Sequence, residues 1–306
     1  WLKSLLMGNV ETVCTTCNLG EGGKVVNVDL EDEGYPTHRF HGKKATELPG
    51  GQHRSHGPPP AVREMMSRRV GDQIVKGNSL TTGPPTPRVT VTYEDGSTYS
   101  GQVLEGNKHG EGKFTFAGGD CYVGQWNHGK AHGDGSYTTE TSKYTGQWID
   151  DNKDGGGKEE WTDGCSYEGQ YRRGSKHGEG VFKWTDGSIY RGQFFQNRVE
   201  GEGGFKWEDG RHFQGQWKSN RMNGRGIYTW PDGRRYQGQY RMDKKDGVGV
   251  FRWPNGSIYE GQWQDGKQHG EGLFTEAKGD ARRGVWSAGT RIRWLDPDIG
   301  GADTKM

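Results

Sequence analysis

The chain has 306 residues, of which only 28% are hydrophobic, whereas 11% are aromatic and 55 residues are glycine. This composition argues against a compact core of Leu, Ile and Val, so structure must come from aromatic packing on a glycine-rich backbone. The formal net charge of +1 predicts no nucleic-acid partner, and no stretch is apolar enough to span a bilayer. With four cysteines and no secretory signal expected from Trp1–Leu6, we expect a reducing, cytoplasmic environment.

Residues 1–88 differ in composition from the rest of the chain, and we expect them to be largely disordered. Proline clusters at 58–60 and 84–87 are typical of extended linkers. Residues 61–75 could cover an aromatic surface elsewhere in the chain, lie on a membrane, or form only a transient helix. The apolar side of that short helix would consist of Val62, Met65, Met66 and Val70.

An acylation pattern occurs near the start, because Met7-Gly-Asn-Val-Glu-Thr12 matches M-G-x-x-x-[ST]. If translation begins at Met7, Gly8 becomes the acceptor for a myristoyl chain. One such chain binds a membrane only marginally, and palmitoylation of Cys14 and Cys17 could supply the second signal. The alternatives are a chance match, or a redox or zinc role for the two cysteines.

From residue 89 to residue 294 the chain is a repeat array, followed by a short tail at 295–306. Residues 89–93 read as a lone capping strand, and Arg283-Gly-Val-Trp286 reads as a degenerate half repeat. The period between these ends is 22 or 23 residues. Eight units begin at the aromatic residues Tyr99, Tyr122, Tyr144, Tyr167, Tyr190, Phe213, Tyr236 and Tyr259.

The unit from Tyr167 to Ile189 shows how one repeat should fold. Alternation in Tyr-Glu-Gly-Gln-Tyr171 and in Gly178-Glu-Gly-Val-Phe-Lys-Trp184 places rings and glycines on one face and polar residues on the other. The glycines would let a ring of the neighbouring strand lie flat over bare backbone. We therefore predict an all-β fold, an elongated single-layer antiparallel sheet of about 17 strands built from stacked β-hairpins.

These units resemble the MORN (membrane occupation and recognition nexus) repeat family. The family pattern of Tyr-x-Gly-x-Trp, His-Gly-x-Gly, an aromatic pair and Asp-Gly is nearly complete in Tyr259–Phe274, and the resemblance covers about Tyr93–Trp294. Two units depart from it, with Thr139 and Glu159 replacing aromatic residues, and we expect them to be the loosest part of the sheet. The resemblance implies a non-enzymatic scaffold at a membrane, the cell cortex or a cilium.

Three patterns that suggest chemistry are better explained by the repeat. Gly261–Lys267 and Gly124–Lys130 have the outline of a phosphate loop, but strand follows strand there and no helix N-terminus is expected. The histidines His109, His132, His177 and His269 share a turn position in hairpins about 10 Å apart, too far for one metal ion. A glutamine at the fourth position of all eight units is expected to bond to adjacent strands. We predict no metal, no cofactor and no catalytic residues.

The leading hypothesis is a scaffold that binds a partner protein through its aromatic face, on a helix or extended peptide, and that is tethered to a membrane through Gly8, Cys14 and Cys17. Alternatives are a ciliary or axonemal structural subunit, similar to the MORN proteins of radial-spoke heads, and a regulatory module of a phosphoinositide kinase. Membrane lipids and a second copy are further candidate partners. The predicted partner-binding residues are Trp126, Trp148, Tyr171, Trp184, Trp207, Trp217, Trp230, Tyr240, Trp253 and Trp263.

Overall fold

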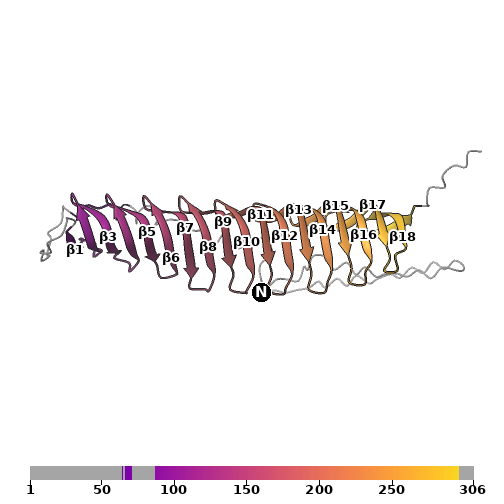
Figure 1. Cartoon of the computed structure of the whole chain (residues 1–306), viewed down its shortest axis with the longest axis horizontal. Helices are drawn as coiled ribbons and strands as arrows, with labels where there is room; N and C mark the ends of the chain where they lie inside the picture. Colours follow the sequence, from indigo (N-terminus) through magenta and orange to yellow (C-terminus); the bar gives the residue numbers. More distant parts are fainter. Residues whose placement is uncertain (1–63, 65, 71–86, 296–306) are drawn as a thin grey trace, which may run out of the picture. The chain divides into compact units, whose positions relative to one another are not determined.

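The computed structural model describes residues 64, 66–70 and 87–295, so the predictions on Gly8, Cys14 and Cys17 lie outside the described residues. The array forms one antiparallel sheet of 19 strands, in which each strand pairs with the next along the chain, as Figure 1 shows. The predicted all-β fold is therefore confirmed. Among the described residues, no helix has the length and apolar character needed to cross a membrane.

The strands are β1 (Arg88–Thr92), β2 (Thr98–Leu104), β3 (Asn107–Thr115), β4 (Cys121–Asn127), β5 (Lys130–Thr138), β6 (Ser142–Ile149), β7 (Asn152–Trp161), β8 (Ser166–Arg172), β9 (Ser175–Lys183), β10 (Ile189–Phe195), β11 (Arg198–Lys206), β12 (His212–Lys218), β13 (Arg221–Thr229), β14 (Arg235–Arg241), β15 (Lys244–Arg252), β16 (Ile258–Gln264), β17 (Lys267–Thr275), β18 (Ala281–Ser287) and β19 (Thr290–Trp294). The expected degenerate half repeat is instead a complete hairpin, β18–β19, which accounts for the strands beyond the predicted number.

Two kinds of turn alternate along the array. Inside each unit, a two-residue turn has positive φ at both positions, as at Ser219 (50°) and Asn220 (66°), the type I′ geometry that matches strand twist. Between units, the predicted Asp-Gly turn forms a three-residue loop. At Thr185–Gly187, Gly187 N–H donates to Trp184 O (3.1 Å), and Gly187 has a φ of 86°.

A β-bulge in each unit explains why all eight units have glutamine at their fourth position. In β12–β13 the register shifts between Gly215 and Trp217, and Gln216 Oε1 accepts a hydrogen bond from Arg225 N–H (2.9 Å). A Cβ at Gly224 would lie 2.1 Å from that oxygen, so the glutamine needs a glycine opposite it. The predicted hydrogen bonding to the adjacent strand is confirmed, with the same bond made by Gln102, Gln125, Gln147, Gln170, Gln193 and Gln239.

The anchor tyrosines lie flat over pairs of facing glycines, as predicted. Tyr236 covers Gly238 of its own strand and Gly249 of the neighbouring strand, and a Cβ on either glycine would lie 2.4 Å from the Tyr236 hydroxyl. That hydroxyl donates to Gln239 O (3.0 Å), which holds the ring along the strand. Burying one such ring removes about 150–250 Å² from water. At about 25 cal/mol per Å² this is worth roughly 4–6 kcal/mol. The cost of each strand glycine is smaller, about 0.5–1 kcal/mol.

Candidate functional site on the aromatic face

An edge-to-face zipper of rings runs through the units on the face that carries the anchor tyrosines. Successive rings have centroids 4.9 to 6.1 Å apart and interplanar angles of 75° to 90°. The anchor ring of each unit therefore contacts a ring of the next unit, so packing crosses every unit boundary. In order the zipper contains Tyr99, Trp126, Tyr122, Trp148, Tyr144, Tyr171, Tyr167, Phe194, Tyr190, Trp217, Phe213, Tyr240, Tyr236, Trp263, Tyr259, Trp286 and Trp294.

A second line of rings, here called the rim row, follows the turns that join the units from β7 onward. Its neighbouring centroids lie 4.3 to 5.9 Å apart without a break. The rim row contains Trp161, Phe182, Trp184, Phe205, Trp207, Tyr228, Trp230, Phe251, Trp253 and Phe274. Four members of this row are only partly buried: Trp161, Trp230, Trp253 and Phe274.

The ten predicted partner-binding residues divide between the two rows. Eight are buried, with at most 8% of the residue exposed, and belong to the packing of the sheet: Trp126, Trp148, Tyr171, Trp184, Trp207, Trp217, Tyr240 and Trp263. Trp230 and Trp253 of the rim row are only partly buried. Contact with a partner by any of the ten stays a prediction, but the accessible aromatic surface lies around these two tryptophans.

Lysines within the aromatic face are the feature that sequence reasoning missed. Lys108 is fully buried, and its Nζ lies 4.9 to 5.6 Å from the centroids of four rings, Tyr93, Tyr99, Phe114 and Trp126. Rings present negative faces to a cation, which partly offsets the loss of water. Burial nevertheless lowers the pKa of Lys108 to about 7. The available signal was alternation, because Lys108 is two residues before Gly110 and shares a strand face with Phe114.

A short segment of the chain, residues 66–70, already occupies the aromatic face above Lys108. The ammonium donates to Met66 O (2.6 Å) and Arg68 O (2.8 Å), and Val70 N–H donates to Gly106 O (2.9 Å). Met66 and Val70 are 0% and 3% exposed, and Arg68 pairs with Asp95 (2.8 Å). Of the three alternatives for residues 61–75, the described residues 66–70 follow the one that covers the aromatic face, whereas Val62 and Met65 lie outside the described residues.

A buried ion pair replaces aromatic packing in the atypical unit of β6 and β7. Lys153 Nζ lies 2.5 Å from Glu159 Oε1, and the two side chains are 3% and 5% exposed. Tyr171 donates to the other carboxylate oxygen (3.1 Å), and burial together with this carboxylate raises the pKa of Tyr171. Strand pairing continues through the unit, and the rim row begins at its last strand residue, Trp161. Whether the unit is loose stays a prediction.

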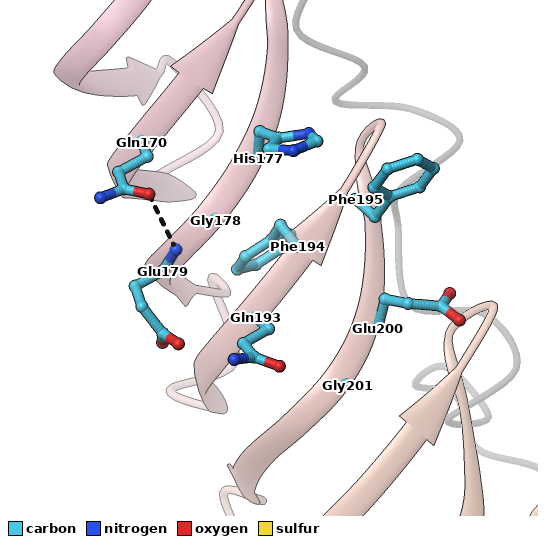
Figure 2. Close-up of a pocket in the computed structure, with 9 residues that line it drawn as sticks. All are labelled: Gln170, His177, Gly178, Glu179, Gln193, Phe194, Phe195, Glu200 and Gly201. Carbon is cyan, nitrogen blue, oxygen red and sulfur yellow. Dashed lines mark hydrogen bonds between the residues drawn. The ribbon is translucent and has the colours of Figure 1, made fainter.

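The opposite, polar face carries the histidines and a shallow depression. The prediction that four histidines occupy turns was wrong. His177 is the third residue of β9, and the other three hold the same position in their strands: His109 in β3, His132 in β5 and His269 in β17. Figure 2 shows His177 beside the exposed Phe195, with ring centroids 5.2 Å apart. The depression there is lined by Gln170, His177, Gly178, Glu179, Gln193, Phe194, Phe195, Glu200 and Gly201. Within residues 64, 66–70 and 87–295, no three His, Cys, Asp or Glu side chains are placed to hold a metal ion.

Comparison with known proteins identifies the repeats. The MORN repeat model matches residues 99–121, 122–141, 144–166, 167–189, 190–210, 213–234, 236–258 and 259–281. No curated protein matches the chain in sequence.

Two solved structures have a similar arrangement of strands. The wild-type TCP10 domain of Danio rerio CPAP is 12% identical, with 68% of this chain and 99% of that chain covered and a TM-score of 0.38. The TCP domain of Drosophila melanogaster SAS-4 (dCPAP), in complex with a proline-rich motif of Ana2 (dSTIL), is 16% identical, with 54% and 96% covered and a TM-score of 0.30.

Proposed function

Because the chain belongs to the MORN repeat family, we propose that it is a non-enzymatic scaffold whose aromatic face binds a segment of a partner protein. The observation that carries the proposal is the seating of residues 66–70 on that face. Met66 is completely buried there, and main-chain carbonyl groups of the segment accept hydrogen bonds from Lys108. The surface is therefore suited to a short peptide that contributes apolar side chains together with its backbone.

The rim row around Trp230 and Trp253 is the surface that we propose for the partner. Both tryptophans contact the buried ring of Phe251, with centroids 5.6 and 4.6 Å away. Because each of these rings packs against its neighbours, it would lose little conformational entropy when a partner binds. Large, partly exposed aromatic residues on a rigid support are the residues that most often dominate binding energy at protein interfaces.

Site-specific photo-crosslinking tests this proposal. A photoreactive phenylalanine analogue placed at Trp253 in the full chain should crosslink, in native cells, to one segment of one partner protein. The matched control carries the same analogue at Val248, which is 60% exposed in the same region of the sheet. A synthetic peptide of the crosslinked segment should then bind the wild-type chain and lose affinity for a Trp230→Ala/Trp253→Ala variant. Identical crosslinks from both positions, or unchanged peptide affinity in a folded double variant, would refute the proposal.

We also propose that the scaffold is held at the cytoplasmic side of a membrane through acylation at Gly8 and at Cys14 or Cys17. Support comes from the acylation pattern and from a basic area on the polar face of β12–β15. Like charges stand directly opposite one another there, at Lys218 and Arg221 and at Arg235 and Arg252. Two like charges in this arrangement repel each other, and an anionic lipid surface would offset that repulsion.

Intact-mass measurement of the protein from native cells tests the tether, because an acylated Gly8 adds the mass of a myristoyl chain. An unmodified terminus at Trp1 would refute it. Detergent would release a lipid-anchored protein but not a ciliary structural subunit, and this fractionation separates the two hypotheses.

A further inference from the structure

The environment of Lys108 is reproduced near the other end of the array, at Lys245. The Lys245 ammonium lies 4.7 to 5.4 Å from the centroids of Trp230, Tyr236, Phe251 and Trp263. Lys245 and each of these rings lie 137 residues after Lys108, Tyr93, Tyr99, Phe114 and Trp126, respectively. We call this second arrangement the Lys245 cage. It combines the same cation with the same number of surrounding rings.

The two cages differ in their accessibility. Lys108 is 0% exposed beneath residues 66–70. Lys245 and Trp230 are only partly buried, as is Trp253, which packs on Phe251 of the cage. Lys176 has a related but smaller set of rings, Trp161, Tyr167 and Phe182, and is 2% exposed. The Lys245 cage is therefore the more exposed of these two four-ring sites.

We propose that the Lys245 cage docks a short segment of a partner protein in the manner in which residues 66–70 occupy the Lys108 cage. Main-chain carbonyl oxygens of the segment would accept hydrogen bonds from Lys245 Nζ, and an apolar side chain would cover the rings as Met66 does. This inference rests on the proposed function and names the position and chemistry of the contact. The segment seated on Lys108 is the evidence for the class of ligand.

The surroundings of the Lys245 cage indicate that the partner segment needs no arginine. In the Lys108 cage, Asp95 Oδ2 pairs with Arg68 of the bound segment. The equivalent carboxylate, Asp232, already pairs with Arg234 of the array itself (2.7 Å). In the Lys245 cage, Arg234 therefore already occupies the carboxylate that corresponds to the partner of Arg68. A neutral apolar segment should be sufficient for binding there.

A buried acceptor beside the cage adds an independent sign of a ligand. Asp243 stands where Gly106 stands in the first cage, and its Oδ2 is buried and accepts no hydrogen bond from the described residues. Gly106 instead offers its main-chain oxygen to Val70 N–H of the bound segment. An N–H group of a docked segment would satisfy Asp243 in a similar way. The same carboxylate disfavours an acidic ligand, which argues for backbone carbonyls over carboxylate or phosphate groups.

Binding of a defined peptide tests the inference. The probe is a fluorescein-labelled peptide with the sequence of residues 61–73, and its anisotropy is followed on titration with the full chain. We expect saturable binding that weakens at least tenfold in Lys245→Met, which keeps the length and apolar stem of the side chain. Lys244→Met is the matched control, because Lys244 is exposed and points to the opposite face, and it should bind as the wild type does. Circular dichroism verifies that each variant is folded.

Changes in the peptide and in the first cage complete the experiment. A peptide with Arg68→Ala should bind nearly as well as the parent peptide, whereas Met66→Asp should abolish binding. Loss of binding in Lys108→Met but not in Lys245→Met would show exchange with the chain's own segment and would overturn the inference. An absence of any peptide binding would overturn it as well. Binding that depends on Trp230 but not on Lys245 would refute the cage while leaving the proposed scaffold function intact.

Discussion

The substitution Gly249→Ala tests the physical basis of the whole array, the close approach of a ring to bare backbone. The new Cβ would lie 2.4 Å from the Tyr236 hydroxyl and 2.6 Å from two of its ring carbons. The ring cannot simply move aside, because Tyr240 and Trp263 hold it edge-on with centroids 5.2 and 5.1 Å away.

The expected cost can be estimated from the contacts that must change. Overpacking of a well-packed site costs about 1–3 kcal/mol. Displacing Tyr236 also breaks the bond from its hydroxyl to Gln239 O, worth about 0.5–1.5 kcal/mol. We therefore expect Gly249→Ala to lower the free energy of unfolding by about 2–4 kcal/mol, since the two terms act together.

Urea denaturation followed by tryptophan fluorescence and circular dichroism measures this cost. The control is Gly156→Ala in β7, where a Cβ would have nothing closer than 3.9 Å and φ is not positive. That change should be neutral or stabilise the protein by up to about 1 kcal/mol, because alanine loses less entropy on folding. If Gly249→Ala lowers the unfolding free energy by no more than Gly156→Ala does, the ring-over-glycine explanation of the fold is wrong.

Two further predictions concern buried charges. Glu159→Gln leaves Lys153 buried without its carboxylate and should destabilise the protein by about 3–5 kcal/mol in urea denaturation. The double variant Lys153→Met/Glu159→Leu should recover most of this loss, and no recovery would contradict the assignment. Because the pKa of Lys108 is about 7 in the folded protein and 10.5 ordinarily, the folded state binds fewer protons between these values. Stability should therefore rise with pH in that window, by about 2 kcal/mol from pH 7 to pH 9 for this group. Urea denaturation at both pH values should show a smaller rise in Lys108→Met, and an equal rise in both proteins would refute the prediction.

Much of the fold follows from spacing in the sequence alone. The regular return of Tyr-x-Gly-Gln determines a hairpin for each unit, because alternation places the ring and the glycine on the same face of a strand. The facing glycine and the hydrogen-bonded glutamine also lie within the same unit, as in the contacts of Tyr236 with Gly249 and of Gln216 with Arg225. Such contacts join residues close together in the chain, so a local pattern predicts them.

The tertiary structure alone determines which of these side chains are exposed to solvent. Trp207 and Trp230 hold the same position in successive units, but Trp207 is 8% exposed and buried, whereas Trp230 is only partly buried. Lys245 would ordinarily be assigned to solvent, yet the rings of three neighbouring strands and a turn surround it. The seating of Met66 on Lys108 joins residues 42 positions apart. Exposure, cages and docking depend on side chains that several units contribute together, and no single repeat contains that information.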